Sequence, residues 1–304
     1  DAILMQEYAE VHTDGAVQFS QTPRPGEWIR RAGEDIASGQ LVLQAGTALD
    51  AIQIGLLASI GIAQVPVWKR LKVGVLVTGS ELQVPGKALQ SGQIYNSNEF
   101  VWVGLLRAMN LDVQSLGIVP DNLQATVDAF DALKECDLVL SSGGVSVGEE
   151  DHVKPAIERV GELRSWKVAM KPGKPVAFGH IQRTDGTPCW FFGLPGNPVS
   201  SAVAFKLIVK PFLDLLAGRT LQAADWRLAM QTVRADFEWT RPDPRREEFL
   251  RVAVKSGVAS LFANQSSGVL TSLSQSSGLV RVEPGQSIAR GQAVAYVSYQ
   301  DLMK

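Results

Sequence analysis

Cysteine, histidine and any excess of one charge are scarce in this chain. Its 304 residues include two cysteines, Cys136 and Cys189, each inside an apolar, strand-like run. A disulfide framework is therefore not expected, and a reducing compartment is predicted instead. The 3 histidines have no spacing typical of a zinc site. The formal net charge of -2 and the pI of about 6.0 favour neither a nucleic acid nor a membrane surface as partner, so we expect small-molecule substrates.

The sequence also lacks an apolar run of the length that a membrane span needs. Residues 202–218 are the most apolar long stretch, but Lys206, Lys210 and Asp214 interrupt it, whereas a spanning helix needs about 20 predominantly apolar residues. Residues 1–5 are strand-like and have neither the basic start nor the cleavage site of a signal peptide. These absences predict a cytoplasmic protein. Because the chain starts within a strand-like segment, we interpret its first residue as lying inside a domain.

Apolar periodicity divides the chain into four predicted parts. Residues 1–26 alternate short apolar runs with turn signals, which predicts the remnant of a β-rich domain. Residues 27–68 combine a glycine-punctuated loop with a helix from Asp50 to about Ser59, as part of a small connecting domain. Strands alternate with helices over residues 69–219, and short alternating strands return over residues 220–304. The predicted fold is a partial mixed α+β N-terminal region, an α/β domain with a doubly wound, mostly parallel sheet, and a small all-β barrel.

Two loops that follow predicted strands have the composition of a phosphate site. In an open α/β sheet, ligands bind beyond the carboxyl ends of the strands. Residues 78–82, Thr-Gly-Ser-Glu-Leu, offer close backbone approach and hydroxyl donors for an anion, although ordinary turn chemistry also explains them. Residues 141–148 precede a predicted helix whose N-terminal amides suit phosphate. This second loop can equally serve only to turn the chain.

Two further segments contribute lysines and a rigid turn. Within residues 166–175, Lys167 and Lys171 stand four residues apart in an extended stretch and are expected to share a face. They suit phosphate or oxyanion charge, with ordinary solvated lysines as the alternative. Residues 193–200 end a strand and start a helix with Pro198 near its first turn. Such a turn is structural by default, and its backbone amides are the groups that would serve a ligand.

Two aspartates follow predicted strands at the same edge of the sheet. Each has a structural explanation as a helix N-cap: Asp121 for the helix beginning at Leu123, and Asp151 for the next helix. Two carboxylates beside a phosphate loop would also suit Mg²⁺, which takes oxygen ligands and leaves positions for phosphate and water. Asp121 and Asp151 are therefore the predicted metal ligands.

Taken together and in this order, residues 78–82, 141–148, 170–175 and 193–200 resemble the motifs of the molybdopterin molybdenumtransferase family, the bacterial MoeA proteins and the gephyrin E domain. The resemblance extends from near residue 5 to the final β domain and covers essentially the whole chain. Related pterin adenylyltransferases share the α/β domain. They lack the last motif, however, and carry Gly-Gly-Thr-Gly where the second segment of this chain has Gly-Gly-Val-Ser.

The resemblance implies a reaction and its ligands. The reaction is the Mg²⁺-dependent insertion of molybdate into adenylylated molybdopterin, with release of AMP, in molybdenum cofactor biosynthesis. The resemblance also implies a homodimer for the full-length protein and other cofactor-biosynthesis proteins as partners. Two alternatives stay open: a molybdopterin adenylyltransferase, and a non-catalytic scaffold, because the gephyrin relative also clusters receptors.

Carried over by motif position, the resemblance assigns catalytic roles to Glu81, Asp121, Asp151, Lys167 and Lys171. The aspartates would serve the metal and the pyrophosphate, the lysines the anionic charge, and the glutamate a polar contact at the pocket edge. In the β domain, Arg246 and Ser267 fall where the family receives molybdate, a role that suits a guanidinium donor. The substrate-binding residues by the same transfer are Thr78, Gly79, Ser80, Ser142, Gly143, Gly144, Val145, Ser146, Pro195, Gly196, Asn197 and Ser200.

The chain departs from the family pattern in three places. Ser80 stands where bacterial relatives often carry Asp, so a possible extra carboxylate is absent. His152 follows Asp151 where the family usually has Tyr. The family's N-terminal segment, with a Met-Asp-Gly-Tyr motif near the active site of the partner subunit, is not among these residues. We therefore interpret the chain as N-terminally truncated and assign the expected activity to the complete enzyme.

Overall fold

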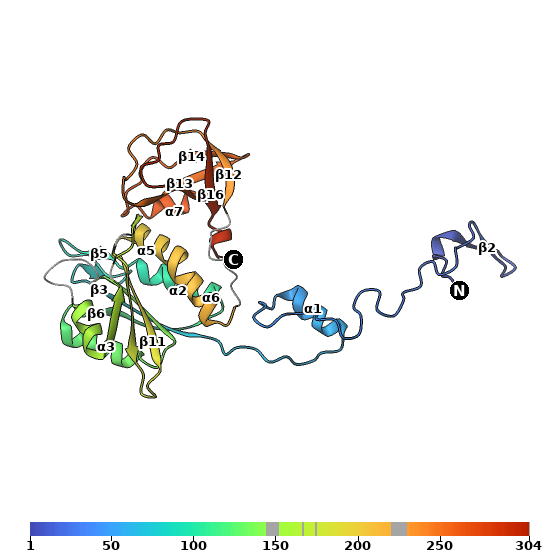
Figure 1. Ribbon diagram of the computed structural model, residues 1–304, viewed down its shortest axis with the longest axis horizontal. Coiled ribbons are helices and arrows are strands. Elements are labelled where there is room, and N and C mark those ends of the chain that lie inside the picture. The colour runs from blue at the N-terminus through green and yellow to red at the C-terminus, as the bar shows by residue number, and fades with distance from the viewer. Residues whose placement is uncertain (144–151, 166, 174, 220–229, 304) are drawn as a thin grey trace. The chain divides into compact units, whose positions relative to one another are not determined.

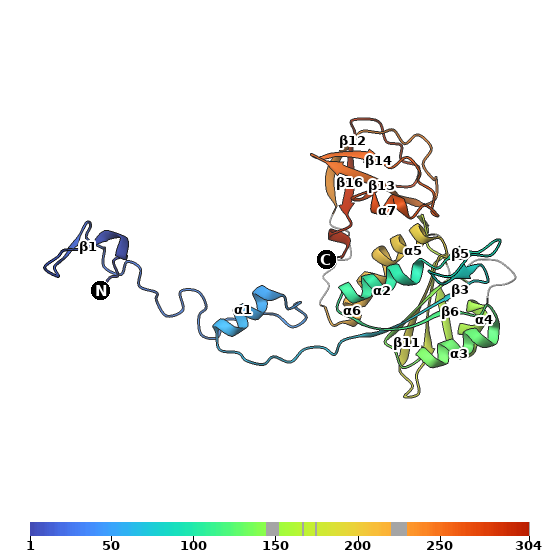
Figure 2. The same cartoon turned by 180° about the vertical axis from the view of Figure 1, so that it is seen from behind.

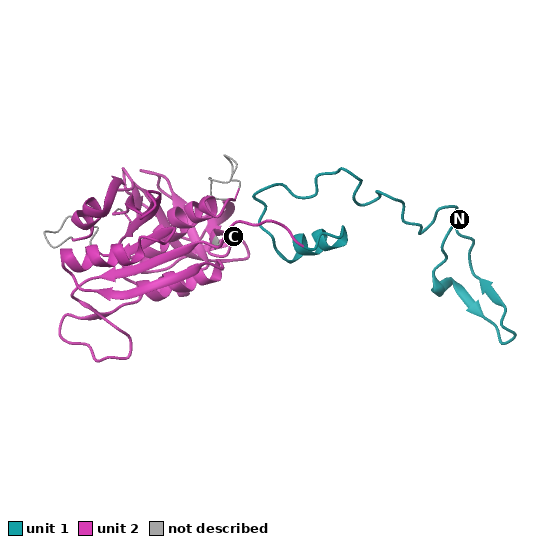
Figure 3. Ribbon diagram, turned by 90° about the horizontal axis from the view of Figure 1, so that it is seen from below, with its two compact units in different colours: residues 1–63 teal, residues 64–304 magenta. Residues whose placement is uncertain are grey.

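The computed structural model of the chain describes residues 1–143, 152–165, 167–173, 175–219 and 230–303. The chain forms two compact units, residues 1–63 and residues 64–304 (Figure 3). The first unit holds a short hairpin and one helix, and the second holds both large sheets. Among the described residues, no helix has the length and apolar character needed to cross a membrane.

The first unit contains little regular structure. After a 3-10 turn, η1 (Gln6–Tyr8), β1 (Ala9–Val11) pairs antiparallel with β2 (Val17–Phe19). Helix α1 (Ala51–Ser59) begins at Asp50, whose carboxylate accepts hydrogen bonds from two amides of the first turn. Those amides have no acceptor within the helix, so the aspartate stabilises the helix start. The predicted helix is therefore present, with the predicted ends.

A six-stranded, mostly parallel sheet forms the middle layer of the α/β part of the second unit (Figure 1). Its strands are β3 (Lys72–Thr78), β6 (Asp112–Val119), β7 (Leu138–Ser142), β8 (Gly161–Ser165), β10 (Ala177–Gln182) and β11 (Pro188–Leu194). They lie in the order β6-β3-β7-β11-β10-β8. β6, β3, β7 and β11 are parallel, whereas β10 runs antiparallel to both β11 and β8. The turn between β10 and β11 is too short for a parallel crossover, which explains the antiparallel edge.

Helices cover both faces of this sheet (Figures 1 and 2). One face carries α2 (Asn98–Ala108), α5 (Pro198–Ala204), a π-helical turn η2 (Phe205–Val209) and α6 (Lys210–Leu216), and the other carries α3 (Leu123–Leu133) and α4 (Val153–Val160). Consecutive residues of β3 point to opposite faces of the sheet. Val75 packs in the cluster that contains Trp102, and Leu76 packs in the cluster that contains Phe130. Burial on both faces explains the continuous apolar run of the strand.

A second six-stranded sheet forms the C-terminal part of the same unit. Its strands are β9 (Met170–Lys171), β12 (Gln231–Ala235), β13 (Glu247–Lys255), β14 (Val258–Leu261), β15 (Gly278–Val282) and β16 (Ala293–Ser298). The order is β14-β12-β16-β15-β13-β9, and β14 also pairs with β13, which closes a small barrel. Val252, Val280 and Tyr296 belong to its buried core. Two short helices, α7 (Thr271–Ser274) and η3 (Asp301–Met303), complete this part of the chain.

One strand of the barrel sheet comes from within the α/β segment. β9 pairs in parallel with Glu247 and Glu248 at the start of β13. Sequence periodicity placed all of residues 69–219 in the α/β domain, whereas the structure gives Met170 and Lys171 to the barrel sheet. A two-residue strand has no periodicity of its own, so its partner was not predictable from its pattern. Through this pairing, backbone hydrogen bonds attach a segment between β8 and β10 to the barrel sheet.

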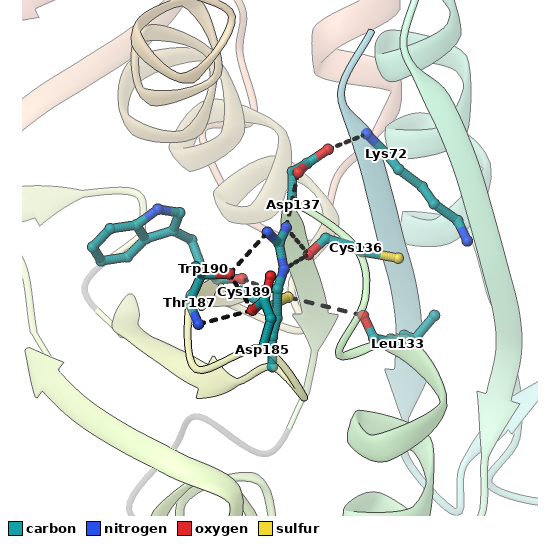
Figure 4. A network of polar contacts seen from close by, with 9 residues as sticks. Lys72, Leu133, Cys136, Asp137, Asp185, Thr187, Cys189 and Trp190 are labelled. Carbon is teal, nitrogen blue, oxygen red and sulfur yellow. Dashed lines mark hydrogen bonds and ion pairs between the residues drawn. The ribbon is translucent and has the colours of Figure 1, made fainter. Parts of the chain in front are cut away.

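A polar network fixes the amino ends of β3 and β7 (Figure 4). The Asp137 carboxylate accepts hydrogen bonds from the Lys72 amide and from the Arg183 guanidinium, both at 2.8 Å. Arg183 also donates twice to the Cys136 carbonyl oxygen. Cys136 and Cys189 are buried free thiols, and burial raises the pKa of Cys189 to about 12. Both cysteines are therefore structural, as the sequence predicts.

Candidate functional site

A cavity of about 1070 Å³ lies between the carboxyl end of the parallel sheet and the C-terminal barrel. One wall comes from the ends of β3 and β7, the start of α2 and the turn between β11 and α5. The other wall comes from β9, β13 and residues 265–270. Its described lining belongs entirely to the second unit. Open α/β sheets generally bind ligands at this edge.

The ends of β3 and β7 are locked together beside this cavity. Thr78 and Ser142 both line it and are buried. Gly143 has a φ of +85°, and a Cβ atom there would lie 2.4 Å from the Thr78 carbonyl oxygen. Glycine alone tolerates both this backbone angle and this close approach. Two hydroxyl-bearing side chains are thereby held at one edge of the cavity.

Glu81 folds back over the loop that follows β3. A Cβ atom at Gly79 would lie 2.6 Å from Oε2 of Glu81, so the absence of a side chain at Gly79 leaves room for the carboxylate. The chain then enters β4 (Leu82–Gln83), which pairs in parallel with β5 (Ile94–Tyr95). Glu81 lines the cavity, whereas Gly79 and Ser80 of the same predicted loop do not.

One residue that the sequence motifs did not indicate connects two predicted loops. Asn98, in the first turn of α2, is 8% exposed. Its Nδ2 donates to Ser142 Oγ and to the Gly196 carbonyl oxygen, both at 2.7 Å. At the same helix start, Asn96 Oδ1 accepts a hydrogen bond from the Glu99 amide at 3.3 Å. The Asn98 amide therefore serves the cavity wall.

The turn between β11 and α5 joins the two walls. Pro198 occupies the first turn of α5, where its missing amide costs no helical hydrogen bond. The Val199 amide has no acceptor within the helix and donates to the Ser267 carbonyl oxygen of the barrel wall at 3.0 Å. The predicted residues of this turn that line the cavity are Pro195, Gly196, Asn197 and Ser200.

Lys171 reaches the cavity from β9 and forms an ion pair with Glu248 of β13. Lys171 Nζ and Glu248 Oε1 lie 2.7 Å apart. Glu248 is 2% exposed, and its Oε2 accepts from Trp239 Nε1 and from the Asp243 amide, each at 2.9 Å. Burial alone would raise the pKa of Glu248, but these hydrogen bonds outweigh burial and hold the pKa below its ordinary value. Glu248 therefore stays ionised and fixes the Lys171 ammonium at the cavity wall.

A second carboxylate holds Arg246 at the same wall. Arg246 Nε donates to Asp243 Oδ2 at 2.8 Å. The amides of Arg245 and Arg246 each donate to Oδ1 of Asp243 at 3.0 Å. These hydrogen bonds, with that of the Arg246 side chain foremost, lower the pKa of Asp243 to about 2. Arg246 and Ser267, the two residues predicted for an oxyanion, both line the cavity.

Asp121 and Lys167 do not line the cavity. Asp121 follows β6 at the carboxyl edge of the sheet and is half-buried. Its structural explanation as a helix cap is wrong, because Asn122 caps α3 by accepting a hydrogen bond from the Ala125 amide at 2.9 Å. Lys167 is exposed. Only residues 170–171 form a strand here, so the alternation expected to put both lysines on one face does not extend back to Lys167.

Part of the predicted site lies outside the described residues, namely Gly144, Val145, Ser146 and Asp151. Across the part of the chain that the structure describes, no three His, Cys, Asp or Glu side chains are grouped as a metal site. The assignment of Mg²⁺ to Asp121 and Asp151 stays a prediction.

Several lining residues of the barrel wall carry no motif signal, among them Trp239, Glu248, Arg251 and Gln265. Trp239 and Glu248 orient Lys171 as described above, and Arg251 and Gln265 line the cavity farther along β13 and the loop after β14. A charged residue inside an apolar strand run is the signal that could have indicated Arg251, because buried charges need dedicated partners. Nothing in the sequence pattern distinguishes the other three.

Three family descriptions match successive parts of the chain. Residues 74–215 match a probable molybdopterin binding domain. Residues 1–61 match the MoeA N-terminal region, domains I and II, and residues 232–299 match the MoeA C-terminal region, domain IV. The described cavity takes its lining from the second and third of these regions in chain order, which places it between two separately recognised parts.

Individual relatives decide the family. A molybdopterin molybdenumtransferase from Haemophilus influenzae is 48% identical over 220 residues, which cover 72% of this chain and 53% of that protein. One from Nostoc sp. is 32% identical over 302 residues, which cover 97% of this chain and 68% of that protein. The chain belongs to the molybdopterin molybdenumtransferase family. Gephyrin from Dictyostelium discoideum is 32% identical over 311 residues, covering 92% of this chain and 43% of that protein. The chain thus spans about half the length of several relatives of this family that it matches.

Solved structures confirm the fold of this molybdopterin molybdenumtransferase family member. The molybdopterin biosynthesis MoeA protein from Pyrococcus horikoshii matches with a TM-score of 0.74 at 28% identity, covering 98% of this chain and 72% of that chain. A molybdenum cofactor biosynthesis protein from Pyrococcus furiosus matches with a TM-score of 0.66 at 26% identity, covering 88% of this chain and 82% of that chain. The predicted sequence of an N-terminal region, an α/β domain and a β-barrel is confirmed.

Proposed function

We propose that this chain acts in molybdenum cofactor biosynthesis by inserting molybdate into adenylylated molybdopterin, with the help of Mg²⁺ and with release of AMP. The observation that supports the proposal is the cavity in which the described parts of all four motif segments meet the barrel. One wall offers neutral hydrogen-bond donors, and the other offers cations. A substrate with a pyrophosphate and an incoming oxyanion needs both kinds of group.

The α/β wall would bind the nucleotide end of the substrate. Thr78 and Ser142 bring hydroxyls to the end of the sheet, and Asn98 fixes Ser142 against the turn that contains Gly196. Hydroxyls and backbone amides donate hydrogen bonds to phosphate oxygens without adding fixed charge. Because these groups are already ordered by each other, binding would cost little additional side-chain entropy.

The barrel wall would receive molybdate. Arg246 supplies guanidinium donors and Ser267 belongs to the same lining, while Lys171 adds a second positive charge. Asp243 and Glu248 hold the two cations in place. A guanidinium with a fixed plane suits an oxyanion, because several N–H groups then point to one ligand. In the proposed reaction, these residues hold the oxyanion close to the pterin until the metal has been transferred.

Mg²⁺ is the cofactor of this proposal, and the chemistry of the described donors fits it. The polar side chains at this end of the sheet present oxygen atoms, in the Asp121 carboxylate and in the hydroxyls of Thr78 and Ser142, and oxygen is the ligand that Mg²⁺ prefers. Asp121 would hold the ion, together with Asp151, which lies outside the described residues. When bound, the ion would neutralise phosphate charge on the substrate.

Molybdate-dependent release of AMP tests the proposal. The chain is incubated with adenylylated molybdopterin, MgCl₂ and molybdate, and AMP is measured by chromatography. We expect AMP release that requires both molybdate and Mg²⁺ and that falls at least about tenfold in Lys171→Met, because an oxyanion contact would be lost. ATP-dependent adenylylation of unmodified molybdopterin without molybdate would overturn the proposal in favour of an adenylyltransferase. A chain that binds neither adenylylated molybdopterin nor Mg²⁺ would overturn it in favour of a scaffold.

The proposal also includes a homodimer for the full-length protein and a cytoplasmic location, which the family resemblance implies. Light scattering of the purified protein tests the first, since a dimer doubles the measured mass. A mass equal to one chain at micromolar concentration would contradict it.

A further inference from the structure

Arg251 is a buried charge in the middle of an apolar strand. It lies in β13 between Leu250 and Val252, and its own exposure is 1%. Transferring a guanidinium out of water costs free energy unless its donors are satisfied and its charge is balanced. A residue kept there at such a cost needs an explanation beyond packing.

The partners of this guanidinium are neutral. Arg251 Nε donates to Ser272 Oγ at 3.2 Å, and Nη2 donates to the Ser266 and Asn264 carbonyl oxygens at 3.0 and 3.4 Å. No carboxylate in the described part of the chain forms an ion pair with Arg251. The two other cations of the barrel wall, by contrast, are each paired with an acid. Arg251 therefore supplies the cavity wall with a positive charge that no described acid balances.

The loop that Arg251 holds is also attached to its backbone. Gln265 Oε1 accepts from the Arg251 amide at 2.9 Å, and Gln265 Nε2 donates to the Arg251 carbonyl oxygen at 2.9 Å. Gln265 Nε2 also donates to the Phe262 carbonyl oxygen at 2.8 Å. Residues 264–266 are thus fixed to one position of β13 through both its side chain and its main chain.

Ser267, the next residue, connects this loop to α5 on the other side of the cavity. Ser267 accepts the hydrogen bond of the Val199 amide through its carbonyl oxygen at 3.0 Å, and Val199 belongs to the α/β wall. Arg251, Ser266 and Ser267 all line the cavity. A displacement of the loop at Ser266 would therefore move Ser267 and release the Val199 amide.

We propose that Arg251 is a positioning residue that holds residues 264–267 in place to receive a tetrahedral oxyanion and whose unbalanced charge favours a doubly charged one. This inference rests on the proposed function, because it deepens the assignment of the oxyanion to this wall. Arg251 acts through the loop that it holds and through its charge, since the described hydrogen bonds of its side chain all go to that loop and to Ser272.

Two variants in the full chain separate the effect of the Arg251 charge from the effect of its hydrogen bonds to the loop. Arg251→Met removes both, whereas Arg251→Lys keeps the charge and loses the planar fork. Tungstate affinity is measured by isothermal titration calorimetry, and amide hydrogen exchange at Val199 reports the loop. Ser201 supplies an internal exchange reference, because its amide donates within α5 to the Asn197 carbonyl oxygen. Arg183→Met is the matched control, since Arg183 also donates to a carbonyl oxygen, that of Cys136, at the opposite end of the sheet.

We expect Arg251→Met to weaken tungstate binding by about tenfold or more and Arg251→Lys by about three- to tenfold, because only the second retains the charge. Both should speed exchange at Val199 relative to Ser201, and Arg183→Met should change neither quantity. Unchanged affinity and unchanged Val199 exchange in folded Arg251→Lys would overturn the proposal, even if Arg251→Met does not fold. If the unaltered chain binds no tungstate, the proposed oxyanion site fails, while Val199 exchange in Arg251→Lys still decides whether Arg251 positions the loop.

Discussion

At the scale of single residues, Asp243 shows how a carboxylate orients a cavity cation. Its folded pKa is lowered to about 2, first by the hydrogen bond from Arg246 and then by backbone amides. An unfolded aspartate titrates near about 3.9. A lowered folded pKa contributes stability above the unfolded pKa, and this contribution is lost as the pH falls from about 3.9 through about 2. The Arg246 side chain should therefore stay oriented throughout the neutral and mildly acidic range.

Carboxyl ¹³C NMR of Asp243 tests this directly. We expect a titration midpoint near 2 in the unaltered chain and a midpoint nearer to about 3.9 in Arg246→Gln, because the principal hydrogen bond is then lost. Asp236, which pairs with Arg290 on the exposed side of the barrel, provides an internal comparison. An Asp243 midpoint that does not move in Arg246→Gln would contradict the account.

The roles of single side chains were the least predictable from the sequence. Strand alternation predicts that Glu247 and Glu248 face opposite sides of β13, but not which of them faces inward. The structure buries Glu248 beside Lys171 and pairs Glu247 with Arg281 on the other side. The role of Asn98 in the cavity wall was not predictable for a similar reason, because a polar residue at a helix start is explained equally well as part of the cap.

At the scale of elements, the strand ends at the cavity depend on glycine geometry. Gly143→Ala would place a Cβ atom against the Thr78 carbonyl oxygen in a backbone conformation that alanine disfavours. We expect a loss of at least about 2 kcal/mol in the free energy of unfolding. Gly196→Ala is the matched control in the same cavity, since its Cβ would meet nothing within 4 Å, and it should change stability by less than about 0.5 kcal/mol. Urea unfolding measures both, and equal losses would refute the packing argument.

At the start of α3, a helix-capping asparagine lies next to an aspartate that is proposed to bind the metal. Asn122 caps the helix, so Asn122→Ala should lower the free energy of unfolding by about 1 kcal/mol. Asp121→Asn keeps the shape of the side chain and should cost less stability than Asn122→Ala. In the proposed function it should nevertheless strongly reduce Mg²⁺-dependent AMP release, because one metal ligand loses its charge. Urea unfolding and AMP chromatography give the two readouts, and undiminished release in Asp121→Asn would remove Asp121 from the metal site.

Elements with a strong periodic signal were predictable, and short elements were not. The valine-rich run of β3, the helix after Asp50 and the alternation of strands and helices all follow from local patterns. The antiparallel edge at β10 and the two-residue β9 depend on which distant segment lies alongside. A short segment carries no record of its partner, so the pairing of β9 with β13 was not predicted.

At the scale of the whole molecule, one wall of the cavity was predictable from a fold rule and the other only from the family resemblance. The rule that parallel strands present their carboxyl ends at one edge predicted that the loops after β3, β7 and β11 would meet. No such rule places a barrel against that edge, and Arg246 and Ser267 were assigned to the site through the family resemblance alone. The structure brings both into the same cavity as Thr78 and Ser142. The division into a nucleotide wall and an oxyanion wall is thus the central claim.

Anomalous X-ray scattering from tungsten tests that claim most directly. Tungstate stands in for molybdate, and crystals of the chain are soaked with tungstate and adenylylated molybdopterin. The account predicts a tungsten peak inside the cavity, beside Arg246 and Ser267, with the nucleotide density against Thr78 and Ser142. A dominant tungsten peak outside the cavity, or nucleotide density on the barrel wall, would contradict it.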